Sequence, residues 1–437
     1  MIKWKKNNQK YLRRKSGITL VALVITIIVL LILAGVALST LTGNDSIIQN
    51  AGTVVGDYNS QQEVDEAVLN SIAGYLEQHM TNGGNNPPST GGEAPLITTA
   101  SGIHSETTEY QDAKGNKIVV PGGFKVRTDI ATTVDKGIVI EDSTGDSNST
   151  GNQFVWVPIG TITKSDDTEV TIEFGRYSDF SLTASPAQYA TNNRWNAATP
   201  INAELGNFSE LTTYRGSNYA KDMENSNATA RSLQSFIENA IANEGYYIAR
   251  YEASFGSGDV VWLSNGRAGV TNQKPQFKQS TDISDGGMNF SEGTLWRLIR
   301  QGDASLACQN LYAGNEYNGK SYVESDLVNS YAWDTAIMFI QKCSDKTTYW
   351  DDTDNGLYNT GEDEGKTIDN PCNIYDMKGN LAEWTTEYSY YSGGYYSCVF
   401  RGNYPGYGYT AMRFSVDATS CDEYVGFRAV LSCSPVS

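Results

Sequence analysis

The sequence predicts an α+β fold rich in loops, preceded by a long apolar helix near the N-terminus. Short runs of β-branched residues between turn residues, such as NKIVVPGGFKV (116–126) and GNQFVWVPIG (151–160), predict short strands. Apolar residues at three- and four-residue spacing predict short helices in residues 231–242, 293–312 and 332–343. Long polar stretches without periodicity separate these elements, and they predict large surface loops.

The N-terminal part of the chain predicts a membrane anchor. Residues 18–41 (ITLVALVITIIVLLILAGVALSTL) contain no charged side chain, and as a helix they would be about 36 Å long, enough to cross a membrane. Seven Lys and Arg residues precede Gly17 and predict that the N-terminus is cytoplasmic and the rest is exported. Apolar spacing continues to residue 80, so the helix of residues 18–80 extends beyond the membrane. We therefore expect a single-pass cell-membrane protein with an extracellular C-terminal domain.

The same segment resembles a type IV prepilin. A basic leader (residues 1–17) ends in Gly17, and an apolar helix follows at once. The resemblance implies cleavage after Gly17 and assembly on a pilus. Pilins carry a glutamate at the fifth mature position, where this chain has Ala22. A plain signal anchor, pilin-like assembly and membrane-held display therefore all stay open.

A change of composition marks a domain boundary after the helix. Residues 81–104 form a predicted linker, because TNGGNNPPSTGGEAP (81–95) has no periodic apolar face. The remaining residues, 105–437, have the mixed strand and helix patterns and are predicted to form one domain.

The charge and the cysteine count exclude several functions. The chain of 437 residues carries 32 Lys and Arg against 50 Asp and Glu, a net charge of −18, which argues against a nucleic-acid partner. Six cysteines occur without a CxxC pair, and only two histidines are present, so we expect no zinc site. One or two disulfides would suit an extracellular domain, but their pairing stays open.

Five motifs in the C-terminal domain carry a specific resemblance. They are GYYIARYEAS (245–254), AWDTAIMFI (332–340), CNIYDMKGNLAEWTTE (372–387), FRGNY (400–404) and VGFRAVL (425–431). Together they resemble the formylglycine-generating-enzyme, or sulfatase-modifying-factor, domain family over about residues 105–433. The resemblance implies a C-type-lectin-like fold that is rich in loops.

The motif YDMKGNLAEW contains a predicted metal site. Gly379 suits a tight turn with positive φ. In the family this turn holds structural calcium, and the resemblance implies as ligands Asp376, the Gly379 and Leu381 carbonyls, and Glu383. Oxygen donors of this kind suit calcium. The alternative is that Asp376 and Glu383 only cap the turn.

Large and charged residues inside apolar motifs indicate the core. Trp156, Trp333 and Trp384 are predicted core anchors. Arg401 and Arg428 lie in otherwise apolar motifs, so we expect them to make internal ion pairs or backbone hydrogen bonds rather than to bind a substrate.

The catalytic chemistry of the family is not expected here. Its enzymes hold copper with two cysteines shortly after the arginine-glycine motif, but RGNYPGYGYTAMR (401–413) contains none. Cys398 precedes the motif and Cys421 lies well downstream, so we expect no copper, no catalytic residue and no enzyme activity. An oxygen- and copper-dependent formylglycine-generating oxidase and a structural minor pilin stay open as alternatives.

A tyrosine-rich stretch near the C-terminus predicts a binding surface. Nine of the 27 tyrosines lie within residues 388–427, among Ser, Gly and Asn. Tyrosine gives a large amphipathic contact area with few rotors to freeze, and small polar residues give adaptable hydrogen bonding. The predicted contacts are Tyr390, Tyr391, Tyr395, Tyr396, Tyr404, Tyr407, Tyr409, Ser415, Asp417, Ser420, Asp422 and Tyr424.

This composition resembles the variable proteins of diversity-generating retroelements, in which mutagenesis of Asn codons scatters such residues over a lectin-fold surface. The resemblance implies a binding face that differs between sister cells, with a protein or glycan ligand, on a phage or on another cell. A fixed sequence with ordinary tyrosine-rich packing is the alternative.

Overall fold

The computed structural model describes the chain from residue 94 to residue 434 with internal gaps. All described residues belong to the second of two compact units, Asp65–Ser437. The leader 1–17, the apolar segment 18–41, the whole predicted helix 18–80 and residues 81–93 of the linker lie outside the described residues. No helix within the described ranges is long and apolar enough to cross a membrane. Those ranges are 94–143, 151–186, 208–210, 233–256, 275–278, 294–312, 321–351, 370–391, 395–403, 408–417 and 420–434.

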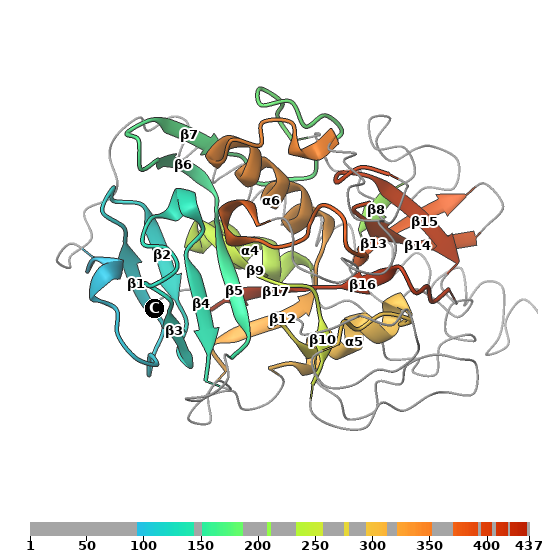
Figure 1. Cartoon of the computed structure of the whole chain (residues 1–437), viewed down its shortest axis with the longest axis horizontal. Coiled ribbons are helices and arrows are strands. Elements are labelled where there is room, and N and C mark those ends of the chain that lie inside the picture. Colours follow the sequence, from blue (N-terminus) through green and yellow to red (C-terminus); the bar gives the residue numbers. More distant parts are fainter. Residues whose placement is uncertain are drawn as a thin grey trace, which may run out of the picture. The chain divides into compact units, whose positions relative to one another are not determined.

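A six-stranded antiparallel sheet forms the centre of this domain (Figure 1). Its strands follow the order β12-β17-β9-β5-β4-β3, so β3, β4 and β5 are consecutive in the sequence, whereas β9, β17 and β12 join them from distant parts of the chain. All six residues of β5 are buried, because apolar groups cover both of its faces. The strands are β3 (Phe124–Val126), β4 (Val139–Asp142), β5 (Gln153–Pro158), β9 (Gly245–Ala249), β12 (Val323–Leu327) and β17 (Ala429–Cys433).

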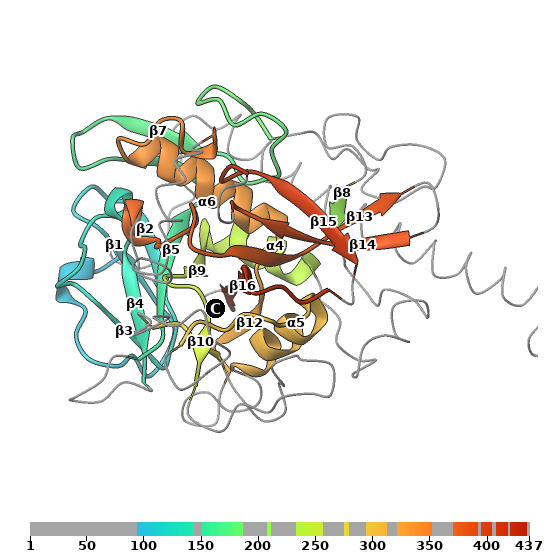
Figure 2. The same ribbon diagram turned by 45° about the vertical axis from the view of Figure 1, so that its right-hand side comes forward.

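A second sheet carries the tyrosine-rich stretch. Its strands follow the order β15-β14-β13-β16, and β8 pairs with β13 (Figure 2). β13 is antiparallel to β14 and parallel to β16. The strands are β8 (Phe208–Glu210), β13 (Ala382–Tyr391), β14 (Tyr395–Arg401), β15 (Arg413–Asp417) and β16 (Val425–Phe427).

Helix α6 (Ser330–Cys343) contacts both sheets through β5 and β13 (Figure 1). Its N-terminus is capped by Asn329, whose side chain accepts a hydrogen bond from the Ala332 amide at 2.9 Å. Every residue of α6 except Lys342 is buried. The helix therefore lies inside the domain, in contact with both sheets.

The remaining described elements are short. Helix α4 (Leu233–Asn243) contacts β17 and β9, and α5 (Gln301–Asn310) contacts β12 and β13. The other strands form three hairpins. They are β1 (Thr108–Gln111) with β2 (Lys117–Val120), β6 (Gly160–Thr163) with β7 (Glu169–Ile172), and β10 (Ser254–Phe255) with β11 (Pro275–Gln276). The 3-10 helices are η1 (Ile97–Thr99), η2 (Val134–Lys136), η3 (Tyr349–Asp351) and η4 (Pro371–Asn373).

The described residues confirm a mixed fold, mostly β with few helices and much irregular chain. The strands predicted in residues 116–126 and 151–160 are present as β2, β3 and β5. The helix predicted in 293–312 forms only over Gln301–Asn310. In the preceding part, Leu298 has a positive φ of 55° and Trp296 is fully buried, so tertiary packing overrides the local helical spacing there.

The predicted core anchors are confirmed. Trp156 and Trp333 have no exposed surface, and Trp384 is 1% exposed. The indole N–H of Trp384 donates to the Ile299 carbonyl at 2.8 Å, so burial leaves that polar group satisfied.

Candidate functional site

The tyrosine-rich stretch begins as one long hairpin of β13 and β14. At the turn end of this hairpin, Tyr390 lies opposite Tyr396 and Tyr391 lies opposite Tyr395. On the other edge of β14, Ser397 lies opposite Asp417 of β15. The backbone register therefore places these four tyrosines at directly opposed positions.

The base of the hairpin is embedded in the domain. Residues 382–389 of β13 are all buried, and the pairing of β13 with β14 is irregular between Trp384 and Tyr388. Such an irregularity bends a strand and increases its twist. Tyr388 is only 8% exposed, so this tyrosine belongs to the interior.

Among the predicted contacts whose side chains are described, Tyr409 and Asp422 are the most exposed. Tyr409 is 38% exposed, and its ring makes an edge contact with Trp350, with 6.2 Å between ring centroids. Asp422 is exposed, and its Oδ1 accepts a hydrogen bond from the Tyr424 amide at 2.9 Å. Ser415, Ser420 and Tyr424 are half-buried.

The other predicted contacts are described in part or not at all. Tyr390, Tyr391, Tyr395, Tyr396 and Asp417 have described backbone in β13, β14 and β15, but their side chains lie outside the description. Tyr404 and Tyr407 lie wholly outside the described residues. For all twelve predicted positions, ligand contact stays a prediction.

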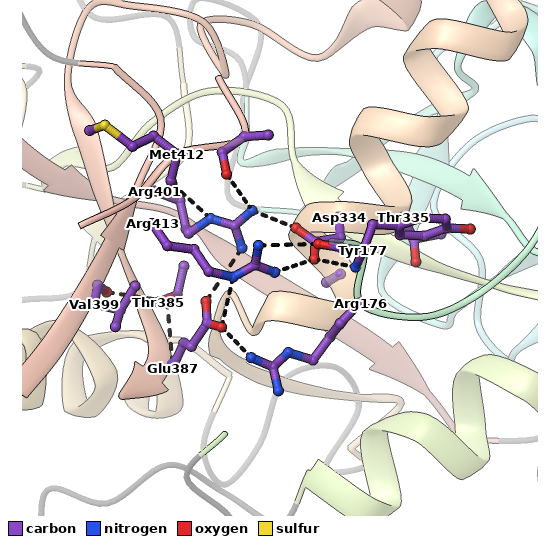
Figure 3. A network of polar contacts seen from close by, with 12 residues as sticks. Arg176, Tyr177, Asp334, Thr335, Thr385, Glu387, Val399, Arg401, Met412 and Arg413 are labelled. Atoms are coloured by element: carbon purple, nitrogen blue, oxygen red, sulfur yellow. Dashed lines mark hydrogen bonds and ion pairs between the residues drawn. The ribbon is translucent and has the colours of Figure 1, made fainter. Parts of the chain in front are cut away.

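A buried ion network lies beneath the hairpin (Figure 3). Arg401 of β14 donates to Asp334 of α6 at 2.5 Å, and it lies 3.4 Å from the Glu387 carboxylate of β13. Arg413 of β15 donates to Asp334 at 2.5 Å and to Glu387 at 2.9 Å. Arg176 also pairs with Glu387. The network therefore joins three strands of the tyrosine-rich sheet to α6.

The strand register places two arginines side by side, and the two acids offset the repulsion between them. Arg401 and Arg413 are directly opposed on β14 and β15, and like charges in that position repel. Asp334 and Glu387 each contact both arginines, so each carboxylate offsets the repulsion. Burial alone would raise the pKa of Glu387, but Arg413, Arg176 and Arg401 lower it to about 2. Glu387 is therefore ionised at neutral pH.

The expected internal role of Arg401 and Arg428 is confirmed. Arg428 donates to both carboxylate oxygens of Glu383 at 2.5–2.8 Å, and neither side chain is exposed. Arg428 also donates to the Ala249 and Tyr375 carbonyls. Both arginines thus connect segments far apart in the sequence rather than facing a ligand.

Further acids surround the Glu383–Arg428 pair. Glu252 accepts hydrogen bonds from the Asn380 side chain and from the Leu381 amide. Burial, together with Glu383 and Asp376, raises the pKa of Glu252 well above its usual value. Glu252 is not among the site residues predicted from the sequence. An acid at the end of a buried strand, in GYYIARYEAS, is the signal that could have identified it.

Of the predicted calcium ligands, Asp376 and Glu383 both lie near Glu252 and Arg428. Asp376 is 2% exposed with φ of 56°, and Gly379 has φ of 82°, as expected for a tight turn. The Gly379 amide donates to Asn403 at 2.6 Å. Both carboxylate oxygens of Glu383 accept hydrogen bonds from Arg428, so this predicted ligand is already paired with a guanidinium. No group of three or more His, Cys, Asp or Glu within the described ranges has the arrangement of a metal site.

Other residues of the site were also missed from sequence. Asp334, Glu387 and Arg413 hold the hairpin, and Trp350 supports Tyr409. Asp334 is a single acid within the apolar helix motif AWDTAIMFI, and that pattern signals a buried ion pair. For Trp350 no local pattern indicated a role, because its neighbours come from a different part of the chain.

Comparison with known proteins decides the family. The family described as "Sulfatase-modifying factor enzyme 1-like domain" matches residues 142–433, about two thirds of the chain. The chain belongs to this family. The sulfatase-modifying-factor domain has a C-type-lectin-like fold, in agreement with the mainly β, loop-rich structure described above.

Two further comparisons add nothing to the assignment of the family. The solved structure "Treponema denticola variable protein 1" has a TM-score of 0.26 and 14% identity, covering 43% of this chain and 85% of that protein. No curated protein matches the chain.

The cysteines of this sulfatase-modifying-factor domain do not follow the expected copper spacing. Cys398 is 1% exposed on β14, and Cys421 is half-buried before β16. Val416 lies opposite Cys398 in the β14–β15 pairing. On the other edge of β14, Tyr388 of β13 lies opposite Cys398, so Cys421 is not a ladder neighbour of Cys398 on either side.

Proposed function

We propose that this protein binds a ligand through the face formed by β13, β14 and β15, and that it catalyses no reaction. The observation that carries the proposal is the division of one hairpin into two parts. Glu387 and Arg401 at its base are fully buried in an ion network, whereas its turn end consists of opposed tyrosines. A rigid base with an aromatic, adaptable end is the chemistry of antibody-like binding surfaces.

An exposed residue near the hairpin is further evidence that β13, β14 and β15 form the binding face. Tyr409 presents part of its ring to solvent while Trp350 holds the other part. A supported aromatic ring loses little conformational entropy on binding, so it can act as an anchor. The predicted contacts then combine aromatic anchors with hydrogen-bonding Ser and Asp side chains.

We further propose that a retroelement diversifies residues 388–427 and that the protein is displayed on the cell surface. Residues 18–41 would hold it in the membrane, with or without pilin-like assembly. Its ligand would be a protein or glycan on a phage or on another cell. The tyrosine, serine and glycine bias of the stretch supports diversification. Sequencing of sister cells should show substitutions concentrated at Asn-derived codons in this stretch; identical sequences in all of them would contradict it.

Two matched libraries test the binding face. One randomises Tyr409, Ser415, Ser420 and Asp422 in the full chain. The control randomises four positions on the β6–β7 hairpin, namely Thr161, Thr163, Glu169 and Thr171, which are exposed or half-buried. Both libraries are displayed on cells and selected against one purified lysozyme. We expect folded display from both libraries but binders only from the first. Loss of folded display from the first library, or equal yields of binders, would contradict the proposal.

Calcium would stiffen the base of this face. The predicted ligands Asp376 and Glu383 would hold it through carboxylate oxygens, with the Gly379 and Leu381 carbonyls. We expect millimolar calcium to raise the melting temperature and a chelator to reverse the change. Asp376→Asn should remove the response, and Asp166→Asn, at an exposed turn, should keep it. A melting temperature that does not change with calcium would contradict the proposed calcium site.

Family membership keeps an oxidase as the second candidate. Its test is titration of the purified chain with copper(I), followed by an assay of a cysteine-containing peptide for aldehyde. Stoichiometric copper binding with aldehyde product would replace the binding function. Failure of both tests would leave the structural minor pilin, for which filament incorporation is the measurement.

A further inference from the structure

Two cysteines, Cys343 and Cys372, line one cavity. The cavity has a volume of about 530 Å³, and Asp135, Lys136 and Lys164 also line it. Cys343 is the last residue of α6, and Cys372 is the middle residue of η4. Helix α6 packs against η4, so the two cysteines lie on neighbouring elements.

Several contacts hold Cys372 in place. The Asn373 side chain donates to the Lys136 and Gly137 carbonyls, both at 2.9 Å. The Cys372 thiol donates to the Asp135 carbonyl at 3.6 Å. Cys372 has φ of 51°, a conformation that is uncommon for a residue with a side chain. Such a backbone persists where the surrounding contacts determine it, so Cys372 has a defined position against η2.

Gly137 allows this close approach of η4 to η2. A Cβ on Gly137 would lie 1.9 Å from the Cys372 carbonyl oxygen, and its φ is 79°. The close contact therefore depends on a residue without a side chain. Cys372 is half-buried as a residue, Cys343 is 4% exposed, and both line the same cavity.

We propose that Cys343 and Cys372 form an intramolecular disulfide when the chain meets an oxidising, disulfide-containing thiol reagent. The bond would join the end of α6 to the motif that leads into β13. Asp334 lies on α6 and Glu387 on β13, so the bond would link the two elements that hold the buried ion network. The inference is independent of the binding function.

The exchange balances with glutathione disulfide as the oxidant. The Cys372 thiol loses its proton and attacks one glutathione sulfur, which releases one glutathione and leaves a mixed disulfide. The Cys343 thiol then loses its proton and attacks the Cys372 sulfur, which releases the second glutathione. The protein loses two electrons and two protons, and one glutathione disulfide becomes two glutathione molecules.

The surroundings of the thiols make this exchange slow at neutral pH. Burial, together with Asp135, raises the pKa of Cys343 to about 12, while Lys164 and Lys136 lower it in part. Burial also raises the pKa of Cys372 well above its usual value. Because the thiolate is the attacking form, mildly alkaline pH should speed the reaction.

Peptide mapping of the full chain tests the bond directly. Trypsin cleaves after Lys342, Lys346, Lys366 and Lys378, so the disulfide would join peptides 343–346 and 367–378. The reduced chain is treated with glutathione disulfide at mildly alkaline pH and digested without reductant. We expect the linked peptide pair and the loss of two of the six thiols.

Single variants provide the control. Cys343→Ser should leave Cys372 as a mixed disulfide with glutathione, and Cys398→Ser should still give the linked pair. The bond closes a loop of about 30 residues, so oxidation should raise the melting temperature by roughly 5 °C in the parent chain. Cys343→Ser should show no such rise.

A second treatment makes both thiols accessible to the oxidant before the chain folds. The reduced, denatured chain is refolded in a glutathione redox buffer, where every thiol is reachable before the fold closes. The linked pair is expected here as well. Its absence from both treatments, or the joining of Cys343 to another cysteine, would overturn the proposal.

Discussion

Arg401 on β14 donates to Asp334 on α6 at 2.5 Å, and neither side chain has exposed surface. The guanidinium carbon of Arg401 also lies 5.9 Å from the Trp333 ring centroid. This pair joins the sheet that carries the tyrosine-rich stretch to the central helix (Figure 3). Removal of one partner would leave a buried charge without compensation, which is costly.

Asp334→Asn should therefore lower the free energy of unfolding by about 3–5 kcal/mol. The variant keeps the shape of the side chain but removes the charge that faces Arg401 and Arg413. Urea denaturation of the full chain measures the loss. The control is Asp345→Asn, because Asp345 is exposed just beyond α6, and we expect a change within about 0.5 kcal/mol. Equal effects of the two variants would mean that the network does not stabilise the fold.

The stability contribution of Glu387 should disappear in acid. Its pKa is lowered from 4.5 to about 2, so its contribution is complete above pH 4.5 and is lost as the pH falls toward 2. The full contribution amounts to roughly 3 kcal/mol. The difference in stability between the parent chain and Glu387→Gln should accordingly shrink between pH 5 and pH 2.

Denaturation at several pH values checks this prediction. Glu324→Gln serves as the control, because Glu324 is exposed on β12. For this variant the difference from the parent chain should stay small at every pH. A Glu387→Gln difference that is constant with pH would show that Glu387 is not held ionised by its arginine neighbours.

Tyr409→Ala should change stability little, by about 1 kcal/mol. The ring is 38% exposed and contacts Trp350 by one edge, so little apolar surface is uncovered. Tyr247→Ala is the matched comparison, because that ring is fully buried and its hydroxyl donates to the Val119 carbonyl at 2.8 Å. We expect a loss of about 3–5 kcal/mol there. Thermal melting distinguishes the two, and a large loss for Tyr409→Ala would place that ring in the core.

Gly137→Ala should cost about 1–3 kcal/mol more than Gly115→Ala. Both glycines have positive φ, 79° and 83°, so the backbone penalty for a side chain is similar. Only at Gly137 would the new Cβ meet another atom, the Cys372 carbonyl oxygen, whereas nothing lies within 4 Å at Gly115. Equal losses in chemical denaturation would show that η4 moves away from η2 at no cost.

Much of the fold could be predicted from local patterns. The buried strand β5, the helix α6 and the tryptophan anchors follow from periodicity and residue size, because burial imposes a repeat on the sequence nearby. The order of five motifs indicated the family, and a positively charged residue in each of two apolar motifs indicated internal ion pairs at Arg401 and Arg428.

The partners of those arginines could not be predicted in this way. Asp334 lies 67 residues before Arg401 in the sequence, and Arg176 lies 211 residues before Glu387, so no local pattern joins them. The same holds for the cavity shared by Cys343 and Cys372.

By itself, the sequence determined which residues the core needs, which family the motifs resemble and where tyrosine gathers. Only the tertiary structure decided that two acids hold three arginines beneath the hairpin and that Tyr409 rests on Trp350. The physical reason is that burial of a strand or helix requires apolar residues at regular spacing, and this spacing can be read within a few residues of the sequence. The pairing of charges and rings depends instead on the topology that brings remote segments into contact.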